Sequence, residues 1–182
     1  GLKVAADLIH AANPNSKVWL SDPTWVNHNK IFSFAGLDIK TYKYYDLTNH
    51  VLDFDGMISD LSQAKEGDVL LLHGCCHNPT GMDLNKEQWQ KVGDLASDKK
   101  LLVLIDIAYQ GFGNGLEEDR LGIDVLSKMP LDLIIVSSCS KNFSLYNQRV
   151  GLLCIYLQDK SVKDKVEAKL KVCVRTNYSN PP

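Results

Sequence analysis

Several features that would assign this chain to a specialised class are missing from its sequence. No apolar run approaches the roughly 20 residues that cross a bilayer, and the N-terminus lacks the basic-then-apolar layout of a signal peptide. The net charge of −2 at pH 7 gives no electrostatic reason to expect a nucleic acid or an anionic membrane as a partner. We therefore expect neither a nucleic acid nor a membrane among its partners.

A disulfide framework and a cysteine-rich metal motif are also missing. The chain has 5 cysteines, an odd number, and most lie inside or beside apolar runs. This pattern favours buried free thiols in a reducing compartment, and we expect a cytoplasmic protein. Cys75, Cys76 and His77 are consecutive, but adjacent side chains point apart and no C-x-x-C partner exists, so we expect no metal.

Nucleotide-binding and hydrolase motifs are likewise not found. There is no Walker A sequence and no G-x-S-x-G elbow. Residues 111–115 form a glycine-rich stretch after an apolar run, but the third glycine of G-x-G-x-x-G would fall at Leu116. The acidic residues 117–119 beside it would repel a phosphate. We interpret this stretch as a flexible loop.

What is present is the pattern of one soluble α/β domain. The chain has 182 residues, of which 45% are hydrophobic and 23% are charged, as in ordinary globular domains. Apolar periodicity predicts helices over 1–12, 26–35, 54–62, 84–97, 120–128 and 160–174, and strands over 17–21, 38–45, 69–73, 101–107, 131–137 and 151–157. Strands that alternate with helices at this spacing predict a mainly parallel sheet flanked by helices.

Polar residues follow three of the predicted strands. Lys141 follows the apolar run 131–136, Asp106 ends the run 101–105, and Asn78 follows the run 69–73. Open α/β proteins bind ligands at the carboxyl ends of parallel strands. A lysine and an aspartate in one cleft suggest a carbonyl cofactor held as a Schiff base, with the acid on a ring nitrogen.

The neighbours of Lys141 strengthen this interpretation, because a lone lysine after a strand is usually a solvated surface residue. Ser138 and Ser140 flank it, and Arg149 lies eight positions further on. Hydroxyls and a guanidinium together suit a phosphate group.

Other residues are candidates for the same site, and each of them also has a purely structural interpretation. Asp106 could simply cap a turn, and Tyr109 could then reach a ring's phenolic oxygen. Trp25 is either a packing residue or the ring that stacks on an aromatic ligand. His28 and His73 are expected to be core groups or to support Asp106 by hydrogen bonds. The remaining histidines, His10 and His50, are expected to face solvent.

Four stretches resemble the class I aspartate/aromatic aminotransferases, which are fold-type I enzymes that depend on pyridoxal phosphate. The stretches occur in family order and at family spacing across nearly the whole chain, and they are residues 22–28, 73–81, 106–112 and 138–151. The amino-acid sequences of residues 73–77 and of the last residues, 177–182, are similar to those of the bacterial branch of this family.

The resemblance implies a role for each candidate residue. Lys141 would form the Schiff base and shuttle the substrate proton, and Asp106 would pair with the pyridinium nitrogen. Tyr109 and Asn78 would hydrogen-bond the phenolic oxygen of the ring. The remaining implied roles are ring stacking by Trp25, substrate carboxylate contact by Trp25 and Asn78, phosphate binding by Ser138 and Arg149, and support of Asp106 by His28 and His73.

The resemblance also implies the reaction and the assembly. Aspartate or an aromatic amino acid would exchange its amino group with 2-oxoglutarate by a ping-pong mechanism in a homodimer. Residues 1–182 would be most of the large cofactor domain, truncated at both ends and without the small domain. We expect these residues alone to have little or no activity, because the family's phosphate loop and substrate arginines would lie outside them.

Two alternatives and two departures from the family pattern accompany this prediction. The same lysine and aspartate serve lyases, decarboxylases and racemases, and a non-catalytic relative is the third possibility. Ser144 stands where the family has glycine, and Cys139 replaces a bulkier residue. If the glycine position needs a positive φ, Ser144 strains the loop.

Overall fold

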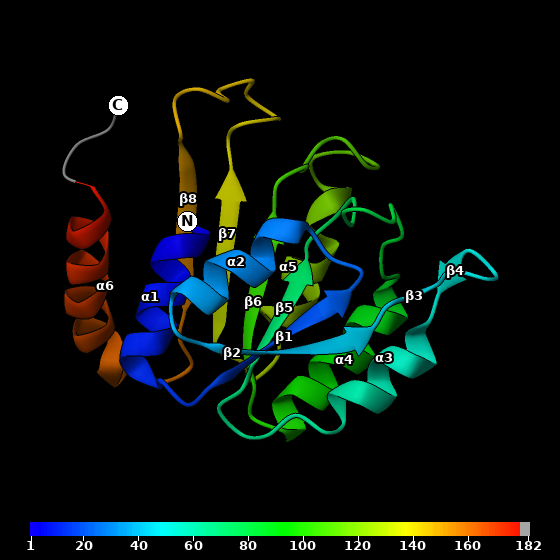
Figure 1. The fold of residues 1–182 in the computed structure, drawn as a ribbon, viewed down its shortest axis with the longest axis horizontal. Helices are drawn as coiled ribbons and strands as arrows, with labels where there is room; N and C mark the ends of the chain where they lie inside the picture. The colour runs from blue at the N-terminus through cyan, green and yellow to red at the C-terminus, as the bar shows by residue number, and fades with distance from the viewer. Residues whose placement is uncertain (179–182) are drawn as a thin grey trace.

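A computed structural model, which describes residues 1–178, contains a central sheet of 6 strands in the order β2-β1-β5-β6-β7-β8 (Figure 1). The strands are β1 (Lys17–Asp22), β2 (Asp38–Lys43), β5 (Val69–His73), β6 (Leu102–Ile107), β7 (Leu133–Ser138) and β8 (Gly151–Tyr156). All neighbouring pairs are parallel except β7 and β8, which are antiparallel. The predicted α/β fold with a mainly parallel sheet is confirmed.

Helices cover both faces of this sheet. They are α1 (Leu2–Ala12), α2 (Val26–Phe34), α3 (Phe54–Leu61), α4 (Lys86–Asp98), α5 (Leu121–Leu126) and α6 (Lys163–Asn177), with short 3-10 helices at Glu118–Arg120 and Lys160–Val162. Each predicted helix is found with shifted ends. Asn85 caps α4, because the Asn85 side chain accepts from the Gln88 N–H and the Gln88 side chain accepts from the Asn85 N–H.

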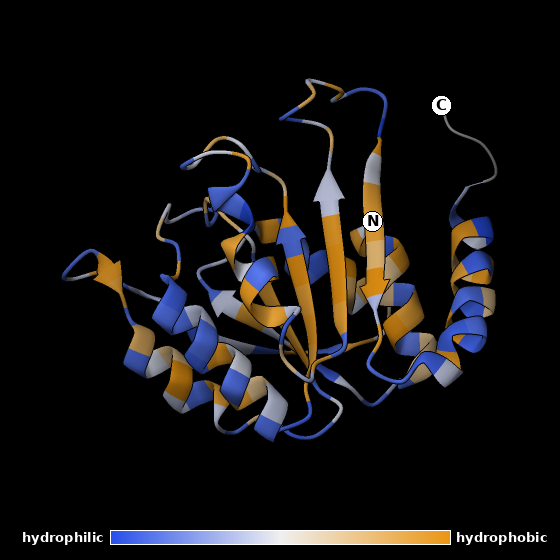
Figure 2. Cartoon of the chain, turned by 180° about the vertical axis from the view of Figure 1, so that it is seen from behind, coloured by the Kyte–Doolittle hydropathy of each residue, from blue (hydrophilic) through white to orange (hydrophobic). Residues whose placement is uncertain are grey.

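The central strands are apolar on both sides because each side packs against helices. In β5, Val69 and Leu71 belong to the core beneath α1 and α2, whereas Leu70 and Leu72 belong to the core beneath α3, α4 and α5. Successive side chains of a strand point to opposite faces, so a strand buried on both sides has no polar alternation. Figure 2 shows the result as strands that are apolar along most of their length and polar near their carboxyl ends, between helices with mixed surfaces.

The last helix closes one side of the molecule. Helix α6 lies beside α1 (Figure 1), and Cys173 is buried against Val4 and Leu8. Along residues 1–178, every helix is too short or too polar for a membrane crossing.

The structure corrects the predicted strand 38–45. Strand β2 ends at Lys43, which is paired with Asp22, the last residue of β1, and its backbone N–H donates to the Asp60 carboxylate at 2.9 Å. The next ring, Tyr44, turns into the core and donates its hydroxyl to the Met82 carbonyl. The chain then forms a separate pair of short strands, β3 (Tyr45–Asp46) and β4 (Val51–Leu52).

The cysteine prediction is confirmed only in part. All 5 cysteines are free, and Cys75 and Cys173 are buried. Cys154 is exposed, because it lies on the uncovered face of the edge strand β8, where Leu152 and Tyr156 are also exposed.

Candidate active site

The polar strand ends meet at one edge of the sheet because of the strand register. His73 at the end of β5 is paired with Asp106 in β6, and Asp106 is paired with Val136 in β7. Parallel strands that end together leave a crevice at their carboxyl ends, where α/β proteins bind ligands.

A cavity of about 460 Å³ lies at this edge. Its lining includes every residue predicted to contact a cofactor or substrate, namely Trp25, Asn78, Asp106, Tyr109, Ser138, Lys141 and Arg149. The side chains that the sequence suggested would converge do share one cavity. Their individual roles stay predictions.

Lys141 lies in the loop that follows β7. Its Nζ atom is 3.8 Å from the centroid of the Tyr109 ring, within the range of a cation–π contact. The backbone N–H of Ser140 donates to the Ser138 hydroxyl at 3.2 Å, which tightens the turn before the lysine. Ser144 has a φ of 56°, so the departure from glycine does fall at a left-handed position.

Arg149 closes the same loop before β8. Its backbone also adopts a left-handed φ of 51°, and its Nη1 donates to the Tyr146 carbonyl at 2.9 Å. The N–H of Cys139 donates to the Val150 carbonyl at 3.1 Å, which joins the two ends of the loop. The arginine is thus delivered to the cavity by a short bridged loop.

Asp106 is held from behind the cavity by His28. Nε2 of His28 lies 2.9 Å from a carboxylate oxygen of Asp106, and the two side chains are 0% and 13% exposed. His28 is on α2, which covers this end of the sheet. The predicted support of the carboxylate by His28 has the required geometry.

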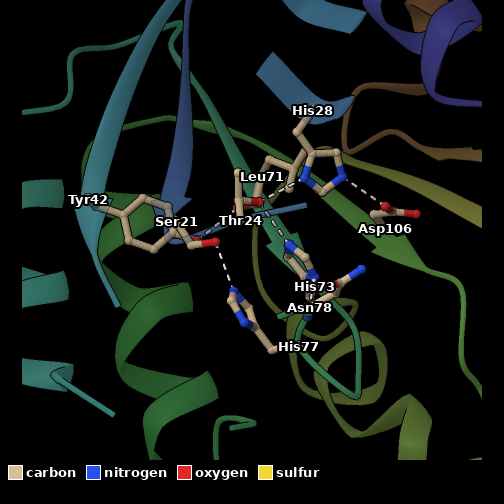
Figure 3. Close-up of polar contacts among 9 residues, drawn as sticks. All are labelled: Ser21, Thr24, His28, Tyr42, Leu71, His73, His77, Asn78 and Asp106. Carbon is tan, nitrogen blue, oxygen red and sulfur yellow. Dashed lines mark hydrogen bonds and ion pairs between the residues drawn. The ribbon is translucent and has the colours of Figure 1, made fainter. Parts of the chain in front are cut away.

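Further hydrogen bonds continue from His28 through Thr24 to His73 (Figure 3). The hydroxyl of Thr24 lies 2.9 Å from Nδ1 of His28 and 3.1 Å from Nε2 of His73. Nδ1 of His73 accepts the backbone N–H of Asn78 at 3.2 Å.

The donor and acceptor roles along this series of hydrogen bonds follow from the backbone N–H of Asn78. Because Nδ1 of His73 accepts an N–H, the neutral ring carries its proton on Nε2 and donates to Thr24. The Thr24 hydroxyl then donates to Nδ1 of His28, and Nε2–H of His28 donates to Asp106. The tautomer of His28 that suits the carboxylate is therefore set from the Asn78 backbone.

Burial keeps His73 neutral. Burial, followed by neighbouring His28, lowers the pKa of His73 to about 4, although Asp106 opposes this shift. The link from His73 to Asp106 runs through Thr24 and His28, and the predicted support of Asp106 by His73 stays a prediction.

A second buried histidine, His77, holds the turn that carries Asn78. Its Nε2 lies 2.8 Å from the Ser21 hydroxyl, and its Nδ1 lies 2.8 Å from the Thr80 hydroxyl. Its ring stacks on Tyr44 with centroids 3.9 Å apart. Burial is again the main cause that lowers its pKa, here to about 3.

Other expectations are corrected by the packing. His10 is partly buried rather than solvent-facing, and its Nδ1 is buried without a hydrogen-bond partner. The loop 111–115 is tied down rather than free, because the Asp119 carboxylate accepts the N–H groups of Gly111, Gly113 and Asn114. The side chains of Cys75 and Cys76 do not point apart, since both sulfurs lie within 4.8 Å of each other and of an Asp119 oxygen.

Sequence reasoning missed Thr24 as part of the site. Thr24 lies in a turn whose composition predicts only a turn, and its hydroxyl meets residues 4 and 49 positions away. No local pattern indicates such a contact.

The fold and the cavity define an α/β domain that presents a lysine, an aspartate and an arginine at the carboxyl edge of its sheet. Residues 1–181 match the family Aminotransferase class I and II. The chain belongs to this family.

Curated relatives and solved structures agree with this assignment. The aspartate aminotransferase of Escherichia coli (strain K12) is 49% identical over 181 residues, which are 100% of this chain and 46% of that protein. The aromatic-amino-acid aminotransferase of Paracoccus denitrificans is 44% identical, with the same coverage of 100% and 46%. The chain therefore spans about half the length of the curated relatives it matches.

A solved structure confirms the predicted fold-type I architecture. The aromatic-amino-acid aminotransferase from Burkholderia pseudomallei superposes with a TM-score of 0.96 at 44% identity, covering 100% of this chain and 45% of that chain. That protein is covalently bound to pyridoxal phosphate.

Proposed function

We propose that this chain is the cofactor-binding part of a pyridoxal-phosphate-dependent aminotransferase. The whole protein would transfer an amino group between aspartate or an aromatic amino acid and 2-oxoglutarate by a ping-pong mechanism. The observation that carries the proposal is one cavity lined by the side chains of Lys141, Asp106 and Arg149. The relatives named above support the reaction class.

The cavity fits the proposed cofactor in size and chemistry. Its volume of about 460 Å³ lies in the range of roughly 300–1,000 Å³ that is usual for small-molecule sites. It offers a primary amine for an aldehyde, a carboxylate for a ring nitrogen, and a guanidinium with hydroxyls for a phosphate. These are the groups that pyridoxal phosphate requires of a protein.

Lys141 and Asp106 would take part directly in the chemical reaction. Bound pyridoxal phosphate supplies an electron sink for the bonds at the substrate's α-carbon. The amine of Lys141 would hold the aldehyde carbon of the cofactor covalently and would move the proton at the substrate's α-carbon. Asp106, whose orientation is set by His28, would keep the ring nitrogen protonated.

The other residues that line the cavity would bind and orient the cofactor and the substrate. Ser138 and Arg149 would hold the phosphate, because a guanidinium fork and a hydroxyl match its oxygens. Trp25, at the N-terminus of α2, would stack on the ring. Tyr109 and Asn78 would hydrogen-bond the phenolic oxygen, and Asn78 and Trp25 would contact the substrate carboxylate.

Cofactor capture tests the proposal directly. The chain is mixed with pyridoxal phosphate, reduced with borohydride, digested, and analysed by mass spectrometry to locate the modified lysine. We expect the adduct on Lys141 and its loss in Lys141→Ala. Lys160→Ala, at an exposed position beyond the cavity, is the matched control and should retain the adduct. An unmodified Lys141 at saturating cofactor would refute the proposal.

Product analysis separates transamination from other reactions of the same fold. The whole protein is supplied with aspartate and 2-oxoglutarate, and we expect glutamate and oxaloacetate in equal amounts. Release of ammonia or carbon dioxide without glutamate would instead indicate a lyase or a decarboxylase.

A further inference from the structure

A cluster of metal-ligating groups adjoins the lysine cavity, which one of its members, Cys75, also lines, and it has no part in the proposed reaction. The sulfurs of Cys75 and Cys76 and a carboxylate oxygen of Asp119 all lie within 4.8 Å of one another. Cys75 and Asp119 are buried, and Cys76 is partly exposed. We propose that these three side chains bind a thiophilic divalent cation, such as zinc or cadmium.

The backbone at Cys76 is what brings the sulfurs together. Neighbouring side chains of an extended chain point to opposite sides, and this was the reason to expect no metal. Cys76 has a left-handed φ of 48°, which breaks that alternation. The conformation is held by Asp83, whose carboxylate accepts the N–H groups of Cys76 and His77 at 2.7 and 2.9 Å.

Asp119 is fixed in place by the glycine-rich loop. Its carboxylate accepts the N–H groups of Gly111, Gly113 and Asn114 at 2.8, 2.9 and 2.8 Å. Carboxylates that ligate metals are themselves commonly oriented by such hydrogen bonds. The third group is therefore immobile and carries its negative charge beside the thiols.

The donor set selects the class of cation. Thiolates favour soft and borderline metals, and zinc takes both cysteine sulfur and aspartate oxygen. Two sulfurs on one tetrahedral zinc lie about 3.8 Å apart, given zinc–sulfur bonds of about 2.3 Å. That separation is within the 4.8 Å found for the cluster, so small side-chain movements complete the site.

Binding of the cation exchanges thiol protons for metal–sulfur bonds. Each thiol releases its proton to solvent, the cation forms two sulfur bonds and one oxygen bond, and no oxidation or reduction occurs. Three protein ligands leave a fourth position for water. His77 stays outside the site because both of its ring nitrogens already have hydrogen-bond partners, Ser21 and Thr80.

Cadmium titration of the reduced chain tests the site. Thiolate–cadmium bonds give a charge-transfer band in the ultraviolet, and equilibrium dialysis counts the bound metal. We expect one tightly bound cadmium per chain, with the band. Cys75→Ser and Cys76→Ser should each weaken binding by about 100-fold or more, since loss of even an outer partner costs 10–100-fold. Cys154→Ser, at an exposed cysteine on β8, should leave the affinity unchanged.

Asp119→Asn tests the third ligand. It removes the charge and keeps one acceptor oxygen for the loop, and we expect about tenfold weaker binding. Unchanged affinity in this variant, when circular dichroism shows a folded chain, would remove Asp119 from the site. The whole proposal fails if the wild type shows no charge-transfer band, or if the Cys75→Ser/Cys76→Ser double variant binds cadmium as tightly as the wild type.

Discussion

Acid should destabilise this protein through two histidines that fold in the neutral form. Burial is the main cause that lowers the pKa of His73 to about 4 and that of His77 to about 3. Their rings lie 4.1 Å apart between centroids, so each also opposes a charge on the other. In the unfolded chain both return to an ordinary pKa of about 6.5.

Hydrogen bonding gives the same preference for the neutral ring of His73. Nδ1 of His73 accepts the backbone N–H of Asn78. A proton on this nitrogen would set two N–H groups against each other.

Proton linkage gives the sign and the size of the change in the free energy of unfolding with pH. Below about pH 6.5 the unfolded chain binds protons that the folded chain does not, so the free energy of unfolding falls as the pH falls. At about pH 5 each histidine has lost about 2 kcal/mol of stabilisation, and the pair about 4 kcal/mol. The stabilisation lost at about pH 5 depends little on the pKa values of the folded chain, because both pKa values lie well below that pH.

Urea unfolding at about pH 8 and about pH 5 measures this difference. The lowered pKa of Asp119 matters only in stronger acid and the raised pKa of Cys75 only in stronger base. Burial also lowers the pKa of the Gly1 amine, which adds a loss in the same direction, but this loss is common to the wild type and the variants and cancels in their difference. The wild type should lose about 4 kcal/mol, and His77→Asn or His73→Asn about 2 kcal/mol.

The comparison is made within each variant, so any overall destabilisation cancels. His50→Asn, at an exposed histidine, is the control and should behave as the wild type. A wild-type loss below about 1 kcal/mol would refute the reasoning, as would an undiminished loss in His77→Asn.

Other substitutions give equally direct expectations, each measured by urea unfolding near neutral pH. Asn85→Ala removes the capping box of α4 and should cost about 1 kcal/mol. Thr24→Val leaves ring nitrogens of buried His28 and of His73 without their partner and should cost roughly 1–3 kcal/mol. Leu104→Ala opens a cavity in the fully buried core and should cost about 2–5 kcal/mol. Ser144→Gly relieves a positive φ and should stabilise by about 0.5 kcal/mol, since the relief of about 1–2 kcal/mol is offset by added chain entropy. An unchanged stability in any one of these variants would contradict the role given to that residue.

Local sequence patterns were sufficient for the elements and for the strand ends. A run of five apolar residues before Asp106 predicts a strand buried on both faces, because only such a strand lacks polar alternation. The alternation of helices and strands then makes the strands parallel, and parallel strands present their carboxyl ends at one edge. For this reason the sequence alone predicts that Asn78, Asp106 and Lys141 line one cleft.

Local patterns failed where groups from other segments decided the outcome. Strand β2 ends at Lys43 because its partner strand β1 ends at Asp22, with which Lys43 is paired. The sulfurs of Cys75 and Cys76 meet because Cys76 is left-handed, a conformation held by Asp83 further along the chain. In both cases the decisive group lies on another segment, and the local sequence does not show it.

The sequence alone thus determined the α/β architecture, the family and the edge of the sheet at which the site lies, since these depend on periodicity and on the order of elements. Only the tertiary structure decided which groups touch there. Thr24 meets His73 across 49 positions and His28 meets Asp106 across 78. Such contacts depend on strand register and on how helix α2 docks over the sheet, and both are set by packing of the whole core rather than by neighbouring residues.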